Sequence, residues 1–234
     1  MTDTDLTTKP LWSRIAEALS ALAQGESLSE VFQKLRTPPE RTVAFAIAVI
    51  ALSAKMAKAD GLVTRDEVTA FREVFHISPA DEPQAAKVYN LARQDIAGYQ
   101  SYARSIAQMF EPGASILEDL LEGLFHIALA DGNYNEKEDE FLREVAGIFN
   151  IREKCFRMLR ARFAPEAARD AYDVLGVDPG TPLAEIKATW RALVRETHPD
   201  QMLARGVPPE AIALATKRLA AVNRAWDEIS QKAA

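Results

Sequence analysis

Apolar residues recur along this chain three or four positions apart, which is the spacing of amphipathic helices. No segment alternates apolar and polar residues for long enough to indicate a β-strand. The most apolar run covers residues 43–54, between Arg41 and Lys55, and it is shorter than the roughly 20 residues that a membrane-spanning helix needs. We therefore predict an essentially all-α protein in which this run belongs to a buried core helix.

Glycines and prolines divide the helical pattern near the N-terminus. An apolar stripe that includes Trp12 and Ile15 ends at Gly25, and a second short helix over residues 29–35 ends before two prolines. The polar side of the first helix lacks the excess of Lys and Arg that draws a helix to anionic lipids. We therefore assign residues 1–40 to an N-terminal helical extension that packs against the next domain.

A weak internal repeat runs through residues 41–165, which we assign to one helical domain. An Ala-Asp-Gly sequence at residues 59–61 recurs 71 positions later at residues 130–132, and an Arg-Glu-Val sequence at residues 72–74 recurs with the same offset. The repeat predicts a duplicated helical hairpin.

Each copy of the hairpin has the same local signals. An apolar helix, over residues 43–59 or 116–130, runs into a glycine suited to a left-handed helix end. The next helix begins on a capping box, in which a polar side chain accepts from a free backbone amide and a glutamate reaches back. The two predicted boxes are Thr64 with Glu67 and Asn135 with Glu138.

The acids of this repeat could also bind a metal ion. Asp131, Asn133 and Asn135 are spaced like the first three ligands of a calcium-binding EF-hand loop. However, Glu136 stands where that loop needs a glycine and Leu142 where it needs a bidentate glutamate. We therefore interpret these residues as signals that end and begin helices, and we expect no cofactor.

The pattern changes after residue 165. Tyr172, Leu175, Gly176 and Val177 form a short motif, and Thr181 and Pro182 are suited to the cap and first position of a helix over residues 182–197. That helix has an apolar face made of Ile186, Trp190, Leu193, Val194 and Thr197. The last helix has a similar stripe made of Ile212, Ala215, Leu219, Val222, Trp226 and Ile229. Two such helices bury their stripes against each other as an antiparallel hairpin.

A His-Pro-Asp motif (His198, Pro199 and Asp200) follows the first helix of this hairpin. Pro199 cannot continue a helix and moves the preceding residue away from the helical region, so we expect the motif at an exposed loop tip. Three cations recur at intervals of four just before the motif and predict a basic ridge on the helix. The basic ridge consists of Lys187, Arg191 and Arg195.

Together these motifs resemble the J-domain of the DnaJ family over residues 170–234. The resemblance is to the class that joins a TerB-like domain to a C-terminal J-domain with a longer loop, here residues 201–209. It implies a co-chaperone, not an enzyme, whose His-Pro-Asp motif contacts a DnaK-type heat-shock chaperone and stimulates its ATP hydrolysis while the basic ridge meets an acidic patch. Trp190, Trp226 and Thr197 stand where that family usually has tyrosine.

Residues 41–165 resemble the TerB-like, or tellurite-resistance, family, whose helical repeat carries the same Ala-Asp-Gly and downstream glutamate signature. The metal binding proposed for that family would fall here on Asp60, Glu67, Asp131 and Glu138. The resemblance implies a TerB-like domain that supplies localisation, ligand binding or client binding. The client protein is not identified by any motif.

The net charge, the cysteine content and the N-terminal sequence limit which partners and which cell compartment we expect. A net charge of −6 gives no general attraction to polyanions, which argues against nucleic-acid binding. The single cysteine, Cys155, excludes an intramolecular disulfide and suits a reducing compartment. Residues 1–9 do not resemble a secretory signal, and residues 1–40 do not provide the N-terminal membrane span typical of this class. We expect a cytoplasmic protein, with peripheral association at the inner membrane as an open alternative.

Two other functions remain open on the sequence. The TerB-like domain could be a stress sensor or metal-binding module that uses the J-domain only to recruit the chaperone. The other alternative is an enzyme that uses His76 or His126 as its general base. Both histidines adjoin apolar residues on helices, however, and are better interpreted as structural.

Overall fold

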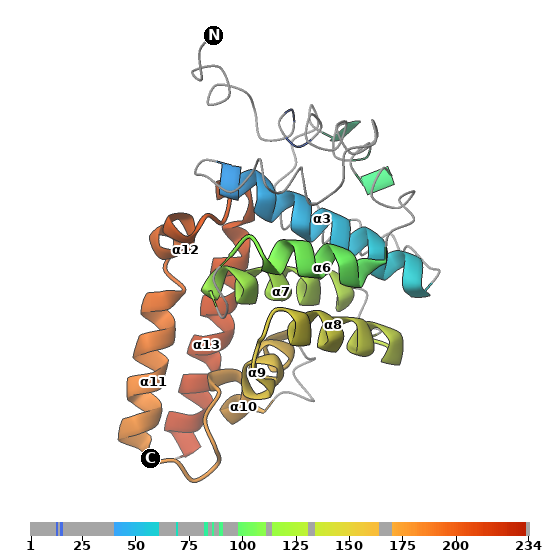
Figure 1. Cartoon of the computed structure of the whole chain (residues 1–234). Coiled ribbons are helices and arrows are strands. Elements are labelled where there is room, and N and C mark those ends of the chain that lie inside the picture. Colours follow the sequence, from blue (N-terminus) through green and yellow to red (C-terminus); the bar gives the residue numbers. More distant parts are fainter. Residues whose placement is uncertain are drawn as a thin grey trace.

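The computed structural model describes residues 40–60, 98–110, 114–130, 134–163 and 170–232, together with single positions at 13, 15, 69, 82, 83, 86, 89 and 90. Every secondary-structure element within these ranges is a helix, which confirms the all-α prediction (Figure 1). None of the helices described here is both long enough and apolar enough to cross a membrane.

Helix α3 (Glu40–Asp60) is the buried core helix that the apolar run predicted. All its side chains from residue 45 to residue 56 are buried. Even Ser53 lies inside, where its hydroxyl donates to the backbone oxygen of Val49 at 2.7 Å. A polar side chain can be buried in this position because its hydrogen bond is made within its own helix.

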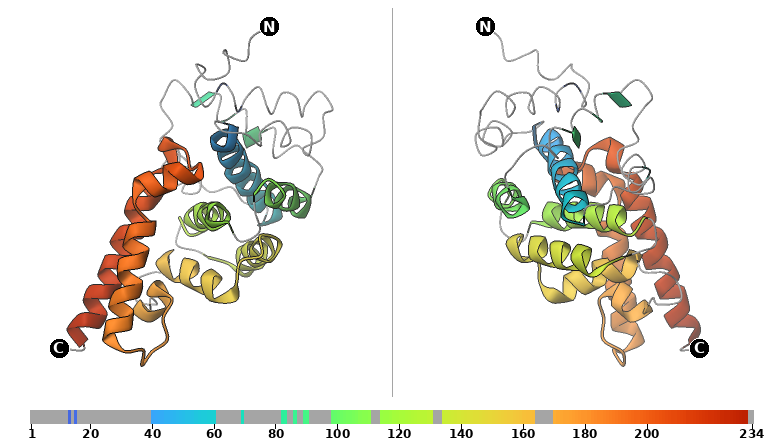
Figure 2. Two further views of the ribbon diagram at one scale, coloured as in Figure 1. Left: turned by 60° about the vertical axis from the view of Figure 1, so that its left-hand side comes forward. Right: turned by 90° about the vertical axis from the view of Figure 1, so that its right-hand side faces the viewer.

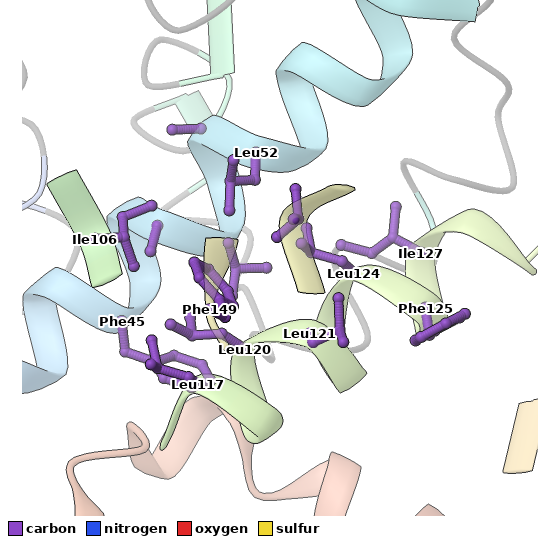
Figure 3. Close-up of a cluster of buried hydrophobic side chains, with 14 of the residues drawn as sticks. Phe45, Leu52, Ile106, Leu117, Leu120, Leu121, Leu124, Phe125, Ile127 and Phe149 are labelled. Carbon is purple, nitrogen blue, oxygen red and sulfur yellow. The ribbon is translucent and has the colours of Figure 1, made fainter. Parts of the chain in front are cut away.

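Four further helices pack with α3 into a bundle: α6 (Tyr99–Ala107), α7 (Ser115–Ala128), α8 (Glu136–Ile148) and α9 (Glu153–Phe163). Phe45 and Leu52 of α3, Ile106 of α6 and a row of leucines on α7 meet in the core (Figure 3). Ile15 is also buried in this core, so this residue of the predicted N-terminal stripe does pack against the bundle. The sequence pattern did not single out α6 or α9.

The second copy of the predicted hairpin is present as α7 and α8. The side chain of Asn135 accepts from the backbone amides of Lys137 and Glu138, at 3.0 and 3.1 Å, and the Glu138 carboxylate accepts from the Asn135 amide at 2.9 Å. This confirms the predicted capping box. Thr64 and Glu67, which form the predicted box of the first copy, lie outside the described residues, as do both glycines of the repeat.

The C-terminal part forms the predicted antiparallel hairpin from α11 (Leu183–Glu196) and α13 (Ala213–Lys232). It lies along one side of the bundle, with the short helix α10 (Ala171–Leu175) against α9 (Figure 2). The rings of Trp190 and Trp226 stack with centroids 5.2 Å apart, and the Trp190 indole donates to the Asn223 side chain at 2.9 Å. The two tryptophans therefore hold the helices of the hairpin together.

Gly176 ends α10 in a left-handed conformation, with φ at 66°. A Cβ atom at this position would lie 2.9 Å from the sulfur of Met158 on α9. Both the backbone conformation and the close approach of the bundle therefore require glycine in this motif.

Three details of the hairpin differ from the sequence prediction. Helix α11 begins at Leu183, after an N-cap at Pro182, because the Thr181 hydroxyl donates to the Asp178 carbonyl and does not cap the helix. Residues 201–209 are not simply a loop, since they contain most of α12 (Pro199–Arg205) and the start of a 3-10 helix, η2 (Pro209–Ala211).

The third difference is that α13 buries more than the single predicted stripe. Leu214, Arg218, Ala221 and Ala225 are also buried, whereas the predicted Leu219 is only half-buried. The helix is covered on more than one side, because it packs against α9 and α10 as well as α11.

Candidate functional site at the corner between α11 and α12

The His-Pro-Asp motif forms a corner between two helices. Helix α11 ends at Glu196, and His198 has extended backbone angles, with φ at −57° and ψ at 134°. The proline-enforced break is therefore confirmed. The motif is nevertheless not at the tip of a loop, because His198 is the N-cap of α12 and Pro199 and Asp200 lie in its first turn. Proline is favoured at the first position of a helix, so Pro199 ends one helix and starts the next.

The two polar side chains of the corner face solvent. The exposed fraction of the side chain is 60% for His198 and 81% for Asp200. The Nδ1 atom of His198 accepts from the backbone amide of Asp200 at 3.3 Å and lies 3.5 Å from its carboxylate. In the neutral imidazole this arrangement leaves the hydrogen on Nε2, which is then a donor directed away from the backbone.

The basic ridge runs along α11 towards this corner. Lys187, Arg191 and Arg195 are all exposed, and none of them forms an ion pair with a described residue. The backbone oxygen of Arg195 accepts from the His198 amide at 3.2 Å, so the ridge ends where the corner begins. An imidazole, a carboxylate and three cations are thus displayed on one continuous stretch of α11 and α12.

The opposite side of the corner is buried against the bundle. Thr197 is buried, and Met202 of α12 and Val207 belong to the same apolar core as α3 and α7. Sequence reasoning missed this contact, because it treated residues 201–209 as an exposed loop.

A buried ionic cluster adjoins this apolar contact. On α7, Asp119 accepts from Arg205 of α12, with 3.0 Å between Nε and the carboxylate, and from Arg218 of α13 at 2.6 Å. Arg218 also pairs with Glu122 of α7. Asp119 and Glu122 are essentially inaccessible to solvent, and the side chain of Arg218 is only 9% exposed. Arg162 of α9 is buried as well; burial lowers its pKa to about 10, while Cys155, Glu118, Asp119 and Glu196 oppose that shift.

One signal in the sequence pointed to this cluster. Arg218 lies three residues after Ala215 and four before Val222, so it falls on the predicted apolar stripe of the last helix. An arginine at such a position is buried only when acidic partners accept from it. The identity of those partners could not be read from the sequence, because Asp119 and Glu122 are far away along the chain.

The structure describes the side chain of only one of the four candidate metal ligands, Glu138, so the candidates are not tested as a set. Among the described residues, no group of three or more His, Cys, Asp or Glu side chains is close enough to hold a metal ion. The carboxylate of Glu138 is used in the capping box. Glu67, Asp131 and the side chain of Asp60 lie outside the described residues.

Of the two histidines considered as catalytic bases, His126 is described and has structural surroundings. The ring of His126 lies 5.9 Å from that of Phe163, and its Nε2 is 3.0 Å from the Lys217 ammonium of α13. His76 lies outside the described residues. Burial and the nearby Glu118 raise the pKa of Cys155 to about 12, so its thiol is not activated.

A surface depression of about 420 Å³ lies over the start of α8 and the end of α9. One of its lining residues is Asp139, which accepts from Arg143 and from the Tyr134 hydroxyl and pairs with Arg160. Burial and the bond to Asp139 raise the pKa of Tyr134. The bonds of Asp139 to these three side chains suit a stabilising surface network better than a binding site.

Comparison with protein families agrees with this architecture. Residues 46–161 match the family described as tellurite resistance protein TerB, and residues 170–234 match the DnaJ domain. The order of the two matches defines the class: a TerB-like helical domain followed by a C-terminal J-domain. No solved structure matches the chain.

Several curated proteins are similar to this chain over most of its length. A protein named "Co-chaperone protein DjlA" in Photobacterium profundum is 26% identical to it, over 82% of this chain and 79% of the relative. The protein of that name in Coxiella burnetii is 29% identical, over 74% of this chain and 72% of the relative. The protein of the same name in Escherichia coli K12 is 24% identical over 82% of this chain and 81% of its own. The chain belongs to the family of DnaJ-like co-chaperones that carry a TerB-like domain and a C-terminal J-domain.

Proposed function

We propose that this co-chaperone binds a DnaK-type heat-shock chaperone through the His-Pro-Asp corner and the basic ridge, and that it stimulates ATP hydrolysis by that partner. The observation that supports this most strongly is the exposure of His198 and Asp200 on a helix corner whose other side is fixed in the core. Groups that are exposed and rigidly held can contact a partner without a large loss of conformational entropy.

The basic ridge has a different role in this proposal. Exposed ion pairs contribute only about 0 to 1 kcal/mol each, so three cations supply orientation and a salt-sensitive association rate more than affinity. Binding is therefore weak and transient. The corner then favours the hydrolysis-competent arrangement of the chaperone by binding it more tightly than the alternatives, with no chemical step on this chain.

Single-turnover hydrolysis of ATP by a DnaK-type chaperone tests this function. We expect the rate to rise with the concentration of added chain and to reach a plateau. A matched sample of the chaperone with an unrelated acidic protein of similar size controls for non-specific effects. A rate that does not change over a concentration range up to saturating levels contradicts the proposal.

We further propose the division into a helical extension at residues 1–40, a TerB-like domain at residues 41–165 and a J-domain at residues 170–234. In this division the TerB-like domain supplies localisation, ligand binding or client binding in the cytoplasm or at the membrane surface. Titration of the full chain with calcium or zinc, followed by calorimetry, tests its metal-binding alternative, in which heat of binding would support a sensor role.

A further inference from the structure

We infer that Asp119 of the TerB-like domain is a positioning residue for the J-domain, because it holds Arg205 in the place from which Arg205 fixes the corner between α11 and α12. The inference rests on the proposed function. It assigns part of the chaperone-activating machinery to a residue that lies about 80 positions before the His-Pro-Asp motif and does not touch it.

Arg205 connects three elements at once. Its Nη1 donates to the backbone oxygen of Glu196 at 3.2 Å, in the last turn of α11. Its Nε and Nη2 donate to the two carboxylate oxygens of Asp119 at 3.0 and 3.3 Å. Arg205 itself is the last residue of α12. One guanidinium therefore joins the end of α12 to the end of α11, and Asp119 determines where that guanidinium lies.

This bond closes the corner that displays His198 and Asp200. The last carbonyl groups of a helix have no partner within the helix, so the Glu196 oxygen is available to an arginine. The bond from Arg205 to this oxygen spans the His-Pro-Asp motif and limits the angle between α11 and α12. That angle sets the direction of the imidazole relative to the basic ridge on α11.

Asp119 is suited to this role because it cannot exchange its partners with water. Its side chain is 1% exposed, and it is held from the other side by Arg218 of α13. A carboxylate buried in this way must keep both cations, since an unpaired buried charge is costly. The side chain of Arg205, by contrast, is 22% exposed, and without Asp119 it would keep only the single bond to the Glu196 oxygen.

The neighbouring apolar contacts also fix the segment that follows the His-Pro-Asp motif. Met202 is fully buried in the core of the TerB-like domain, and Val207 follows it there. Both residues lie within ten positions of His198. The segment that follows the motif is thus anchored in the other domain by its side chains, and Arg205 adds the directional bond that these apolar contacts lack.

Loss of the bond between Arg205 and Asp119 should weaken binding to the chaperone without changing the plateau rate of ATP hydrolysis. Without the bond the corner samples several angles, and the apparent dissociation constant rises in inverse proportion to the fraction that is competent to bind. The chaperone that is bound still meets the same His198 and Asp200. We therefore expect a higher half-saturating concentration of the chain and an unchanged plateau rate.

The test uses the full chain with Arg205→Met, Arg205→Lys and Asp119→Asn in single-turnover ATP hydrolysis by the chaperone. We expect Arg205→Met and Asp119→Asn to raise the half-saturating concentration about fivefold, with Arg205→Lys between them and the wild type. Arg157→Met is the matched control, because Arg157 is exposed on α9 away from the corner. Hydrogen exchange of the free chain should show faster exchange over residues 198–207 in the first three variants only.

The double variant separates positioning from stability. In the Arg205→Met background, Asp119→Asn should still lower the free energy of unfolding through Arg218 but should no longer change the half-saturating concentration. Equal half-saturation for Arg205→Met and the wild type overturns the inference, as does an additive effect in the double variant. If the wild-type chain itself fails to stimulate hydrolysis, the proposed function fails instead.

Discussion

Both sides of the corner between α11 and α12 carry many charged side chains. Those on the outer side are exposed, whereas those on the inner side are largely buried in ion pairs. On the outer side, the basic ridge is exposed and makes no ion pair with a described residue. On the inner side, Arg205 and Arg218 are paired with Asp119 and Glu122 in a largely dry interface. Water stabilises an exposed cation, so only the outer charges can stay available to a partner, while the inner ones are needed to hold the two domains together.

A pair of arginine variants gives the largest expected contrast. Arg218→Ala leaves Glu122 buried without its cation, and we expect it to lower the free energy of unfolding by about 3 to 5 kcal/mol. Arg191→Ala, on the exposed ridge, should change that free energy by less than about 0.5 kcal/mol. Urea unfolding of both variants measures the difference. Equal stabilities would mean that the inner cluster does not hold the domains together.

The second contact between the domains, at Gly176, should show a smaller effect. Gly176→Ala places a Cβ atom 2.9 Å from the Met158 sulfur at a position with φ of 66°, and we expect a loss of about 1 to 3 kcal/mol.

Gly180→Ala is the matched control. It also has a positive φ, of 95°, but its Cβ atom would meet nothing within 4 Å. The cost at Gly180 should therefore reflect the backbone alone. If the two variants lose the same stability in urea unfolding, the packing of α9 on this motif contributes nothing.

Charge reversal on the outer side should have the smallest effect on energy and a distinctive dependence on salt. Arg191→Glu should raise the half-saturating concentration for stimulation several-fold, by roughly 1 kcal/mol. The difference from the wild type should shrink as salt is added, because ions screen exposed charges beyond about 10 Å at 0.1 M. Titrations of the chaperone ATPase at two salt concentrations measure this. A salt-independent difference would indicate that Arg191 is buried in the complex.

The parts of this architecture that could be predicted from the sequence depend on local interactions. The capping box of Asn135 and Glu138 spans four residues, and the break at Pro199 follows from the geometry of one ring. The buried helix α3 was visible as an apolar run. Signals of this kind act between near neighbours, so one sequence is enough to recognise them.

The parts that could not be predicted depend on residues far apart in the chain. Arg205 and Asp119 are separated by 86 positions, and nothing in either local sequence indicates the other. Met202 and Val207 resemble ordinary apolar residues of a loop until the bundle is placed beside them. The division into two domains was accordingly easier to see in the sequence than the interface that joins them.

We expect the corner to activate the chaperone through exposed groups that lie outside the buried contacts between the two domains. The most direct test of this role is single-turnover ATP hydrolysis by the chaperone with saturating His198→Gln chain, alongside His126→Gln as the same substitution elsewhere. We expect no stimulation with His198→Gln, a loss of about 1 kcal/mol or less in its free energy of unfolding, as for a helix cap, and normal stimulation with His126→Gln. Stimulation by a folded His198→Gln chain equal to that of the wild type would contradict this expectation.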